Sequence, residues 1–479
     1  MNKKKRREGS APSESIPTPL QGILASFTSC FTWPSFENFA ALASGWILCR
    51  TRRWITRAIA AGGWVGRKHH SSFYRFFSDA RWSPDAVGQC LFRLLLPRLP
   101  ETVEAMVDDT LCRRAGPRIF GISMHHDGAA SSYGKGIGGA FKALACGHSW
   151  VVLSVRVPLP WNSRGCAVPV LARLYRSPKR CPQSEYRKRT QLARAMVGIL
   201  VEWLPEGRTL HLTGDREYAC RTLLRGLEAS IQFTGPIAMD ARLYGPAPKY
   251  RGRGRPRVRG RREASPKQRA QRGRTKWKKI RVTLYGGRPT ELMVQSWTCL
   301  WYTATGGRLV RVVLTRDPKG SCEDRAFFST NHSATPAEIL QRFARRWLIE
   351  VSFRDTKQLF GLADPQNGFS RGARKKRKRP GPQPRGNRGR KAVERTAPFI
   401  WAVYGIVIVW YLGEERWRRD VSALRQRAPW YRSKATPSFE DMLEALRTEL
   451  LVHRLYRQPL LNRTRAETQR SLRMLGMAA

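Results

Sequence analysis

Acidic residues are scarce in this sequence of 479 residues. It holds 35 Asp and Glu against 88 Lys and Arg, which gives a formal net charge of +53. A field of this sign attracts polyanions, and the usual ones are nucleic acid and anionic membrane surfaces. The length leaves room for two or three domains with a buried core, so the chain need not be a small binding module.

The sequence also lacks long apolar runs, a secretory signal pattern and clustered cysteines. The longest apolar run, 399–413, is shorter than the ~20 residues of a spanning helix, so we predict a buried core helix and no membrane partner. The start, MNKKKRREGSAPSES, has no adjacent apolar stretch or cleavage site, which predicts a cytoplasmic chain without a secretory signal. Ten cysteines without a C-x-x-C pair fit scattered reduced thiols. Among polyanions, nucleic acid is therefore favoured.

Two basic tracts carry about half of the net charge. Residues 249–281 contain 16 Lys and Arg among 33 residues with one acid, and residues 371–391 contain 11 among 21 with none. Like charges repel and the tracts lack apolar anchors, so both are predicted to be flexible arms or loops. Arg beside Gly releases counterions from phosphates, which favours contact with nucleic acid over a solubilising role. Such segments also suit single-stranded RNA.

The first hundred residues have a helical pattern. Residues 51–63 and 66–80 predict two helices around a glycine-rich turn, and Ser83 with Pro84 predicts the start of a third. This is the outline of a helix-turn-helix reader of DNA, and a plain helical bundle fits nearly as well. For the first interpretation, the side chains that would contact DNA are Lys68, His69, His70 and Arg75.

Strand patterns then take over. The predicted order is β-β-β-α-β-α-β, an α/β sheet covered by helices. The strands fall at 102–110, 118–124, 148–160, 209–215 and 231–235, and the helices at 184–205 and 217–229. Four strand-like stretches between 279 and 331 predict a β-rich insertion, whose last strand could return to the main sheet.

One long helix is predicted from Thr335 to about Gly361. Thr335 can cap it, Pro336 suits the first turn and Glu338 completes a capping box. Gly361 is a suitable end.

This helix carries a strip of functional residue types. At about 100° per residue, Phe343, Arg346, Glu350 and Lys357 lie on one face. Taken alone, Glu350 is best explained as an i,i+4 ion pair with Arg346, worth a few tenths of a kcal/mol.

Acids at strand ends give Glu350 a chemical context. Asp108 and Asp109 end one predicted strand and Asp215 ends another, at the edge where α/β sheets usually carry their chemistry. Converging carboxylates repel one another unless a cation lies between them, and hard divalent ions prefer oxygen ligands. The pattern therefore predicts a divalent metal site.

The strip F-x2-R-x3-E-x6-K at 343–357 is similar to the Y-x2-R-x3-E-x6-K signature of the IS4-like and IS701-like DDE transposases. The resemblance extends to DDT at 108–110, GDREY at 214–218 and ERTAPF at 394–399, and it spans roughly residues 100–415. Phe343 stands where the family has Tyr, so a contact made by that hydroxyl is lost. Four motifs in order, with a β-rich insertion before the Glu, make chance a poor explanation.

The resemblance implies an α/β fold with an RNase H-like mixed sheet flanked by helices, a β-rich insertion and a helical N-terminal domain. The family's first Asp precedes the Thr directly, which assigns the catalytic triad to Asp109, Asp215 and Glu350, with Asp108 as an alternative metal ligand. Two Mg²⁺ ions, or Mn²⁺ in their place, would serve phosphodiester hydrolysis and strand transfer. Contacts to DNA phosphates are implied for Arg346, Lys357 and Phe343.

The implied partners are the terminal inverted repeats of an element and a double-stranded target DNA, bound by a homodimer at the bacterial nucleoid.

Two rival hypotheses are a non-catalytic nucleic-acid-binding protein, such as a decayed or domesticated transposase, and a host RNase H-like nuclease that cuts without joining. The predicted divisions are a basic tail 1–17, a helical DNA-binding region 18–98, catalytic parts 99–240 and 331–415 around a basic arm and insertion 241–330, and a helical tail 416–479.

Two other acid or histidine motifs have simpler explanations. Adjacent residues on a strand point to opposite faces, so His125 and His126 are poorly placed to share a zinc ion. Glu217 could assist the acids, but a place in the first turn of a helix already explains it.

Overall fold

The computed structural model describes residues 16–457 except 115–118, 129–143, 251, 253, 273–275, 285–286, 288 and 366–385. Most of the predicted basic tail 1–17 and most of the predicted loop 371–391 lie outside these residues.

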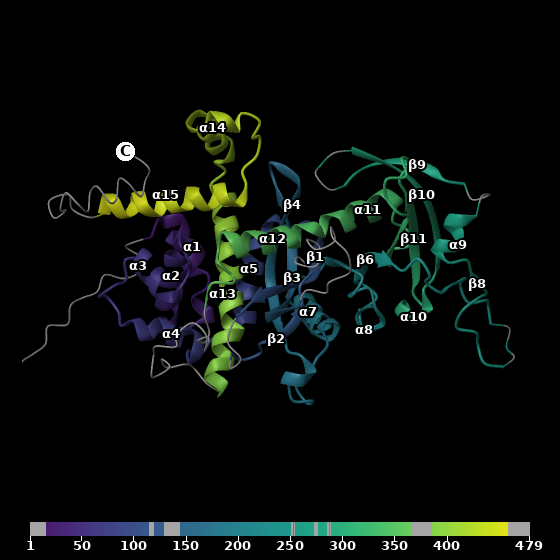
Figure 1. Ribbon diagram of the computed structural model, residues 1–479, viewed down its shortest axis with the longest axis horizontal. Coiled ribbons are helices and arrows are strands. Elements are labelled where there is room, and N and C mark those ends of the chain that lie inside the picture. The colour runs from purple at the N-terminus through teal and green to yellow at the C-terminus, as the bar shows by residue number, and fades with distance from the viewer. Residues whose placement is uncertain are drawn as a thin grey trace, which may run out of the picture.

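Helices make up the N-terminal part and gather around one side of the molecule (Figure 1). The predicted start of the third helix is confirmed, because the Ser83 hydroxyl accepts hydrogen bonds from the N–H groups of Asp85 and Ala86. The longest helix of this part was not predicted. The helices are α1 (Thr18–Ala25), α2 (Trp33–Leu48), α3 (Ile55–Ala61), α4 (His70–Ser78) and α5 (Pro84–Leu95).

A mixed sheet forms the centre and confirms the predicted α/β class. Its strands run in the order β4-β3-β1-β5-β6, with antiparallel pairing from β4 to β1 and parallel pairing from β1 to β6. This is the mixed sheet of an RNase H-like domain. The strands are β1 (Thr102–Arg113), β2 (Ser123–His126), β3 (Leu144–Leu159), β4 (Asn162–Tyr175), β5 (Thr209–Gly214) and β6 (Gln232–Ile237).

The predicted β-rich insertion continues this sheet. Strand β12 pairs with β6, as the sequence suggested, and β11 and β10 follow it, so one sheet of twelve strands spans the molecule. The remaining strands are β7 (Leu243–Tyr244), β8 (Arg262–Glu263), β9 (Lys278–Thr283), β10 (Pro289–Leu300), β11 (Leu309–Arg316) and β12 (Arg325–Ser329), with the short helices α9 (Pro266–Gln271) and α10 (Tyr302–Thr305) beside them.

Three local predictions were wrong. The strand expected at 118–124 is displaced to β2, and the helix expected at 217–229 is reduced to α8 (Arg221–Leu224). Strand β4 was missed because Pro169 interrupts its pattern. The structure accommodates Pro169 at a register shift opposite Ser154, on a strand that pairs with β3 alone.

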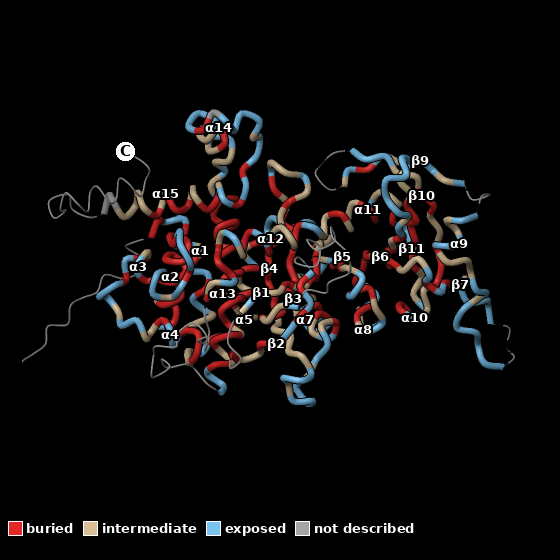
Figure 2. The backbone as a smooth tube through the Cα atoms, viewed as in Figure 1, coloured by how far each residue is buried: buried red, intermediate tan, exposed pale blue. Residues whose placement is uncertain are grey.

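Helices cover both faces of the sheet. Helix α7 (Arg189–Trp203) packs on one face, and α12 (Trp347–Gln358) and α13 (Gly386–Gly413) pack on the other. Helix α13 is long and apolar enough to cross a membrane, but 89% of its most apolar window is buried within the protein (Figure 2). Its Trp401 packs there against Trp150. The predicted core helix is therefore confirmed. Beyond it lie α14 (Trp417–Arg427) and α15 (Phe439–Arg457).

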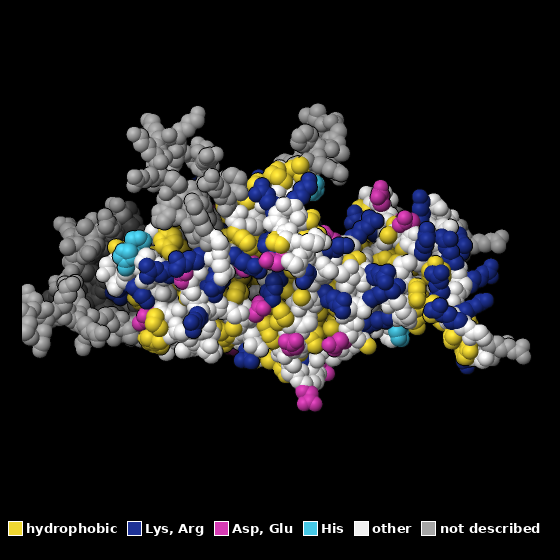
Figure 3. Space-filling model, turned by 90° about the horizontal axis from the view of Figure 1, so that it is seen from below, with side chains coloured by type: hydrophobic (Ala, Val, Ile, Leu, Met, Phe, Trp, Pro, Cys, Tyr) yellow, Lys and Arg dark blue, Asp and Glu magenta, His cyan; other side chains and the backbone are white. Residues whose placement is uncertain are grey.

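Basic side chains are spread over the surface. In Figure 3, groups of Lys and Arg are scattered over the visible face, whereas Asp and Glu form a few small groups. This distribution agrees with the formal charge and leaves a wide positive surface.

Close contact between α2 and α3 depends on Gly45. A Cβ atom added there would lie 2.1 Å from the carbonyl oxygen of Ala58. We expect Gly45→Ala to lower the free energy of unfolding by about 1–3 kcal/mol, measured by urea denaturation. Gly22→Ala is the control, since a Cβ at that exposed site on α1 meets nothing within 4 Å. Equal stability of the two variants would contradict this packing.

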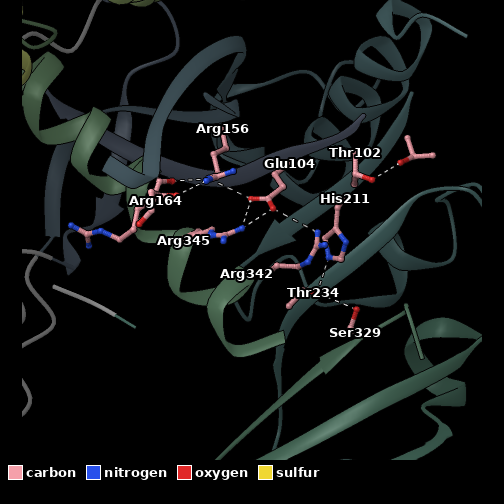
Figure 4. A network of polar contacts seen from close by, with 11 residues as sticks. Thr102, Glu104, Arg156, Arg164, His211, Thr234, Ser329, Arg342 and Arg345 are labelled. Atoms are coloured by element: carbon pink, nitrogen blue, oxygen red, sulfur yellow. Dashed lines mark hydrogen bonds and ion pairs between the residues drawn. The ribbon is translucent and has the colours of Figure 1, made fainter. Parts of the chain in front are cut away.

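A buried hydrogen-bond chain joins the central strands to β12. His211 Nε2 lies 2.8 Å from Thr234 Oγ1, and the Thr234 hydroxyl donates to Ser329 (Figure 4). Burial, helped by the charges of Arg342 and Arg308, lowers the pKa of His211 to about 3. The histidine is therefore neutral in the folded protein at ordinary pH.

This histidine should make stability sensitive to acid. Its folded pKa lies below its unfolded value, so between about pH 6.5 and 3 the unfolded chain binds more protons and stability falls as pH falls. As pH falls from 7 to 5, the free energy of unfolding should decrease by about 1–2 kcal/mol less in His211→Gln than in the parent, as measured by urea denaturation. The exposed His332→Gln should follow the parent, and an unchanged pH dependence of His211→Gln would refute the assignment.

Candidate active site

Strand β1 directs its two neighbouring aspartates to opposite faces of the sheet. The Asp108 carboxylate binds Arg346, which connects α11 (Pro336–Arg345) to α12, whereas Asp109 lies 3.6 Å from Arg189 at the start of α7. Alternation along a strand has this effect on adjacent residues. The helices that cover the two faces therefore give the two aspartates different partners: Asp108 faces the helix that carries Glu350.

Two acids contact Arg346, and the charge of a third acts on it. One guanidinium nitrogen, Nη1, binds the Asp108 carboxylate, and Nη2 lies 2.7 Å from Glu350 Oε1. Burial tends to lower the pKa of Arg346, but the charges of Asp108, Glu350 and Asp215 together raise it above its usual value. Elements distant in sequence therefore bring Asp108 and Glu350 to one guanidinium, within the electrostatic reach of Asp215.

Asp215 reaches this position from the end of β5. The parallel register sets Val107 opposite Gly214, so the next residues, Asp108 and Asp215, lie at adjacent positions. The backbone N–H groups of Glu217 and Tyr218 donate to Asp215 Oδ1 at 2.9 and 3.3 Å. One oxygen of Asp215 is thereby held in a tight turn.

Burial makes the ionised form of Asp108 costly. It raises the pKa of this carboxyl to about 7, Arg346 opposes the shift and Asp215 adds to it. A buried carboxylate beside two further acids needs more positive charge than one arginine supplies.

A second cluster occupies the opposite face. Arg189 lies 3.6 Å from both Asp109 and Glu217, and its guanidinium stands 4.5 Å from the centre of the Tyr175 ring. Burial raises the pKa of Asp109, Arg189 opposes this, and the charge of Asp215 adds to it. Glu217 precedes α8 instead of starting a helix, so the expected helix-dipole explanation of this acid is wrong.

The oxygen ligands fit a hard divalent cation by their chemistry. Asp108, Asp215 and Glu350 are carboxylates, the donor type that Mg²⁺ and Mn²⁺ prefer, and Arg346 already shows that a cation is stable between two of them. Within the described part of the chain, no three His, Cys, Asp or Glu side chains are arranged to hold an ion. His125 is buried and His126 exposed, as the strand alternation predicted.

The helix that carries the strip is broken at Arg346, which corrects the prediction of one continuous helix. The predicted start is confirmed, because Thr335 and Glu338 form a capping box on α11. The N–H of Arg346 then bonds to Phe343 three residues back, a tight turn before α12 begins. The break lets the Arg346 side chain reach Asp108 while Glu350 follows in the first turn of α12.

The other strip residues lie near the acids. The Arg346 guanidinium stands 5.7 Å from the centre of the Phe343 ring, which itself packs on Phe327. The Phe343 ring therefore packs against the Arg346 guanidinium. Burial raises the pKa of Asp109, and the charge of Lys357, in the last turn of α12, is one of those that oppose this rise, so this lysine also lies close to the acids.

The proposed DNA-reading side chains lie elsewhere. Helix α4 is at the far side of the N-terminal helices from β1 (Figure 1). His70 and Arg75 are exposed there, whereas Lys68 pairs with Glu37 on α2 at 3.3 Å and His69 caps α4. The structure does not bring these residues to the acid cluster.

Sequence reasoning anticipated the ion pair of Arg346 with Glu350, but it missed Arg346 as the partner of Asp108 and Arg189 as the partner of Asp109. Arg189 follows a basic run at a helix start, and Glu104 and Asp108 have the i,i+4 spacing of one strand face. Those patterns could have suggested that one face of β1 is charged, but they could not have identified the residues that pair with its acids.

Comparison with known proteins gives one family match. The family described as DDE superfamily endonuclease matches residues 27–290, which include Asp108, Asp109 and Asp215 and end before Glu350. No curated protein matches the sequence. A cryo-electron microscopy structure of a piggyBac transposase synaptic complex with hairpin DNA is similar over 98% of this chain and 83% of that one, at 9% identity and a TM-score of 0.39.

Proposed function

The chain belongs to the DDE superfamily of endonucleases, and on that premise we propose that it is the DNA transposase of an insertion sequence. It would cut the ends of the element by phosphodiester hydrolysis and join them to target DNA. The observation that carries the proposal is that Asp108, from β1, and Glu350, from α12, share the Arg346 guanidinium, on which the charge of Asp215 at the end of β5 also acts. The F-R-E-K strip supports the IS4-like subgroup.

Asp108, Asp215 and Glu350 would hold two Mg²⁺ ions, or Mn²⁺ in their place. The chemistry supplied there is activation of the attacking oxygen and stabilisation of the leaving oxygen in an in-line displacement at phosphorus. We assign the first acid of the triad to Asp108 because it shares a face of the sheet with Glu350. Asp109, the choice from the sequence resemblance, is the alternative.

The remaining residues of the site would either bind DNA phosphates or keep neighbouring side chains in position. Arg346 and Lys357 would bind phosphate oxygens of the DNA strand near the acids, since Arg offers two parallel donors and Lys a point charge. Phe343 would keep the Arg346 guanidinium in place by stacking. Arg189 would hold Asp109 and Glu217 on the opposite face.

The proposed partners are terminal inverted repeats and target DNA, bound by a homodimer at the bacterial nucleoid. The net charge of +53 supports a DNA partner. The surface residues His70 and Arg75 on α4 are the proposed contacts of a helical DNA-binding region, together with Lys68.

The test uses the purified full chain and a plasmid that carries the DNA flanking its coding region on both sides. We expect Mg²⁺-dependent cuts at inverted repeats, no cuts in EDTA, and joining of precleaved ends to a second plasmid. Cutting without joining would instead identify a nuclease. Binding with neither reaction would overturn the enzyme proposal and leave a non-catalytic DNA-binding protein.

A further inference from the structure

Three arginines surround the carboxylate of Glu104 on β1. Arg345 Nη1 lies 2.8 Å from Glu104 Oε1, Arg156 Nε lies 3.6 Å from Oε2, and Arg342 Nη1 lies 3.8 Å from Oε1 (Figure 4). We call Glu104, Arg156, Arg342 and Arg345 the Glu104 cluster. Its members come from β1, β3 and α11, so the tertiary fold assembles it.

The cluster holds more positive charge than its acid balances. In the described part of the chain, Glu104 is the acid in every ion pair of these three arginines, which leaves an excess of two positive charges. Neighbouring His211 is neutral, because burial lowers its pKa to about 3. Burial lowers the pKa of Arg156, and although Glu104 opposes this, the charges of Arg345 and Arg342 add to it.

One hydrogen-bond donor of the Glu104 cluster has no acceptor among the described residues. Arg342 Nη1 is buried and has no hydrogen-bond partner among the residues that the structure describes. A buried donor without a partner costs free energy, so a second anion here would be stabilising. The Arg345 and Arg342 side chains are 29% and 25% exposed, which leaves a path from solvent.

The cluster lies on the same face of β1 as Asp108. Glu104 and Asp108 are four residues apart, about 13 Å along an extended strand. Helix α11 carries Arg342 and Arg345 and leads directly to Arg346, which binds Asp108. A row of guanidinium groups therefore runs from the Glu104 cluster to the acids of the candidate active site.

We propose that the Glu104 cluster is a phosphate-binding subsite for DNA, in which Glu104 holds Arg342 and Arg345 in position until a backbone phosphate engages them. Arg156, whose guanidinium donates to the carbonyl oxygens of Ser163 and Arg164, adds fixed positive charge. The inference rests on the proposed function. The phosphate would lie about four nucleotides from the one at Asp108, given the ~3.4 Å rise per nucleotide of a duplex strand. The contact is to the backbone, so it positions DNA without reading its sequence.

The test measures binding of the full chain to a fluorescein-labelled DNA duplex of arbitrary sequence, at several salt concentrations between 50 and 200 mM. Arg345→Gln should weaken binding by about tenfold and reduce the slope of log affinity against log salt by about 1. Glu104→Gln should have the opposite effect and strengthen binding several-fold, because it removes the acid that competes with the phosphate.

Arg416→Gln and Asp420→Asn are the matched controls, since this arginine–aspartate pair at the start of α14 has similar exposure and lies away from β1. If Arg345→Gln and Glu104→Gln both weaken binding, or neither differs from its control, the cluster is a structural brace and the proposal fails. Should Glu104→Gln not fold, as judged by circular dichroism, Arg345→Lys must keep the salt slope that Arg345→Gln loses. Failure of the parent protein to cut DNA would refute the proposed enzyme without altering these binding outcomes.

Discussion

Glu350→Gln is expected to abolish Mg²⁺-dependent cutting of DNA that carries the element ends, by about a thousandfold or more. Glutamine has the shape of glutamate and its carbonyl oxygen can still accept the hydrogen bond from Arg346 Nη2. It lacks the negative charge that a divalent cation requires. The rate of strand cleavage on a gel, with DNA binding measured in parallel, separates lost chemistry from lost affinity.

The control for this variant is Glu228→Gln, an exposed acid after α8. Both variants should unfold at the same temperature as the parent, because neither loses a buried contact of the core. If Glu350→Gln still cuts DNA within about tenfold of the parent rate, Glu350 is only the partner of an ion pair and the proposed triad is wrong.

Asp108→Asn should lose cutting to a similar extent, by about a hundredfold or more, whereas Asp109→Asn should lose less than about tenfold. The reason is geometric, because Asp108 shares Arg346 with Glu350 and Asp109 faces Arg189 on the other side of the sheet. The comparison is informative because the two substitutions are chemically identical and one residue apart. The measurement is the same cleavage assay, run at saturating Mg²⁺.

Differences in folding stability should not explain a difference in cutting between Asp108→Asn and Asp109→Asn. Burial raises the pKa of both aspartates, so a neutral Asn replaces a charge that the folded protein holds with difficulty. We therefore expect both variants to remain folded in urea denaturation. If Asp109→Asn abolishes cutting while Asp108→Asn does not, the first acid is Asp109, as the DDT motif suggested.

Local signals in the sequence were reliable where they depended on neighbouring residues. The capping box of Thr335 and Glu338, the Ser83 cap of α5 and the apolar helix that became α13 all formed as expected. These features depend on hydrogen bonds within one turn or on the apolar composition of one segment. The return of the last strand of the insertion to the main sheet, which the sequence left open, is also present, because β12 pairs with β6.

Local signals failed where packing decided the outcome. Pro169 masked β4, since only a strand with a free edge and a register shift tolerates it. The predicted helix through Glu350 breaks at Arg346, where the chain turns so that this side chain reaches β1. Neither result could be derived from the periodicity of its own segment.

The sequence by itself determined that this is a strongly basic α/β protein and which acids are candidates for its chemistry, because charge, motifs and strand ends are properties of short segments. Only the tertiary structure decided that Asp108 and Glu350 meet at Arg346, that Asp109 turns to Arg189, and that Glu104 gathers its arginines. Alternation along β1 separates the two aspartates, but the helix that covers each face comes from residues far away in the chain. Long-range packing therefore selects the members of the site.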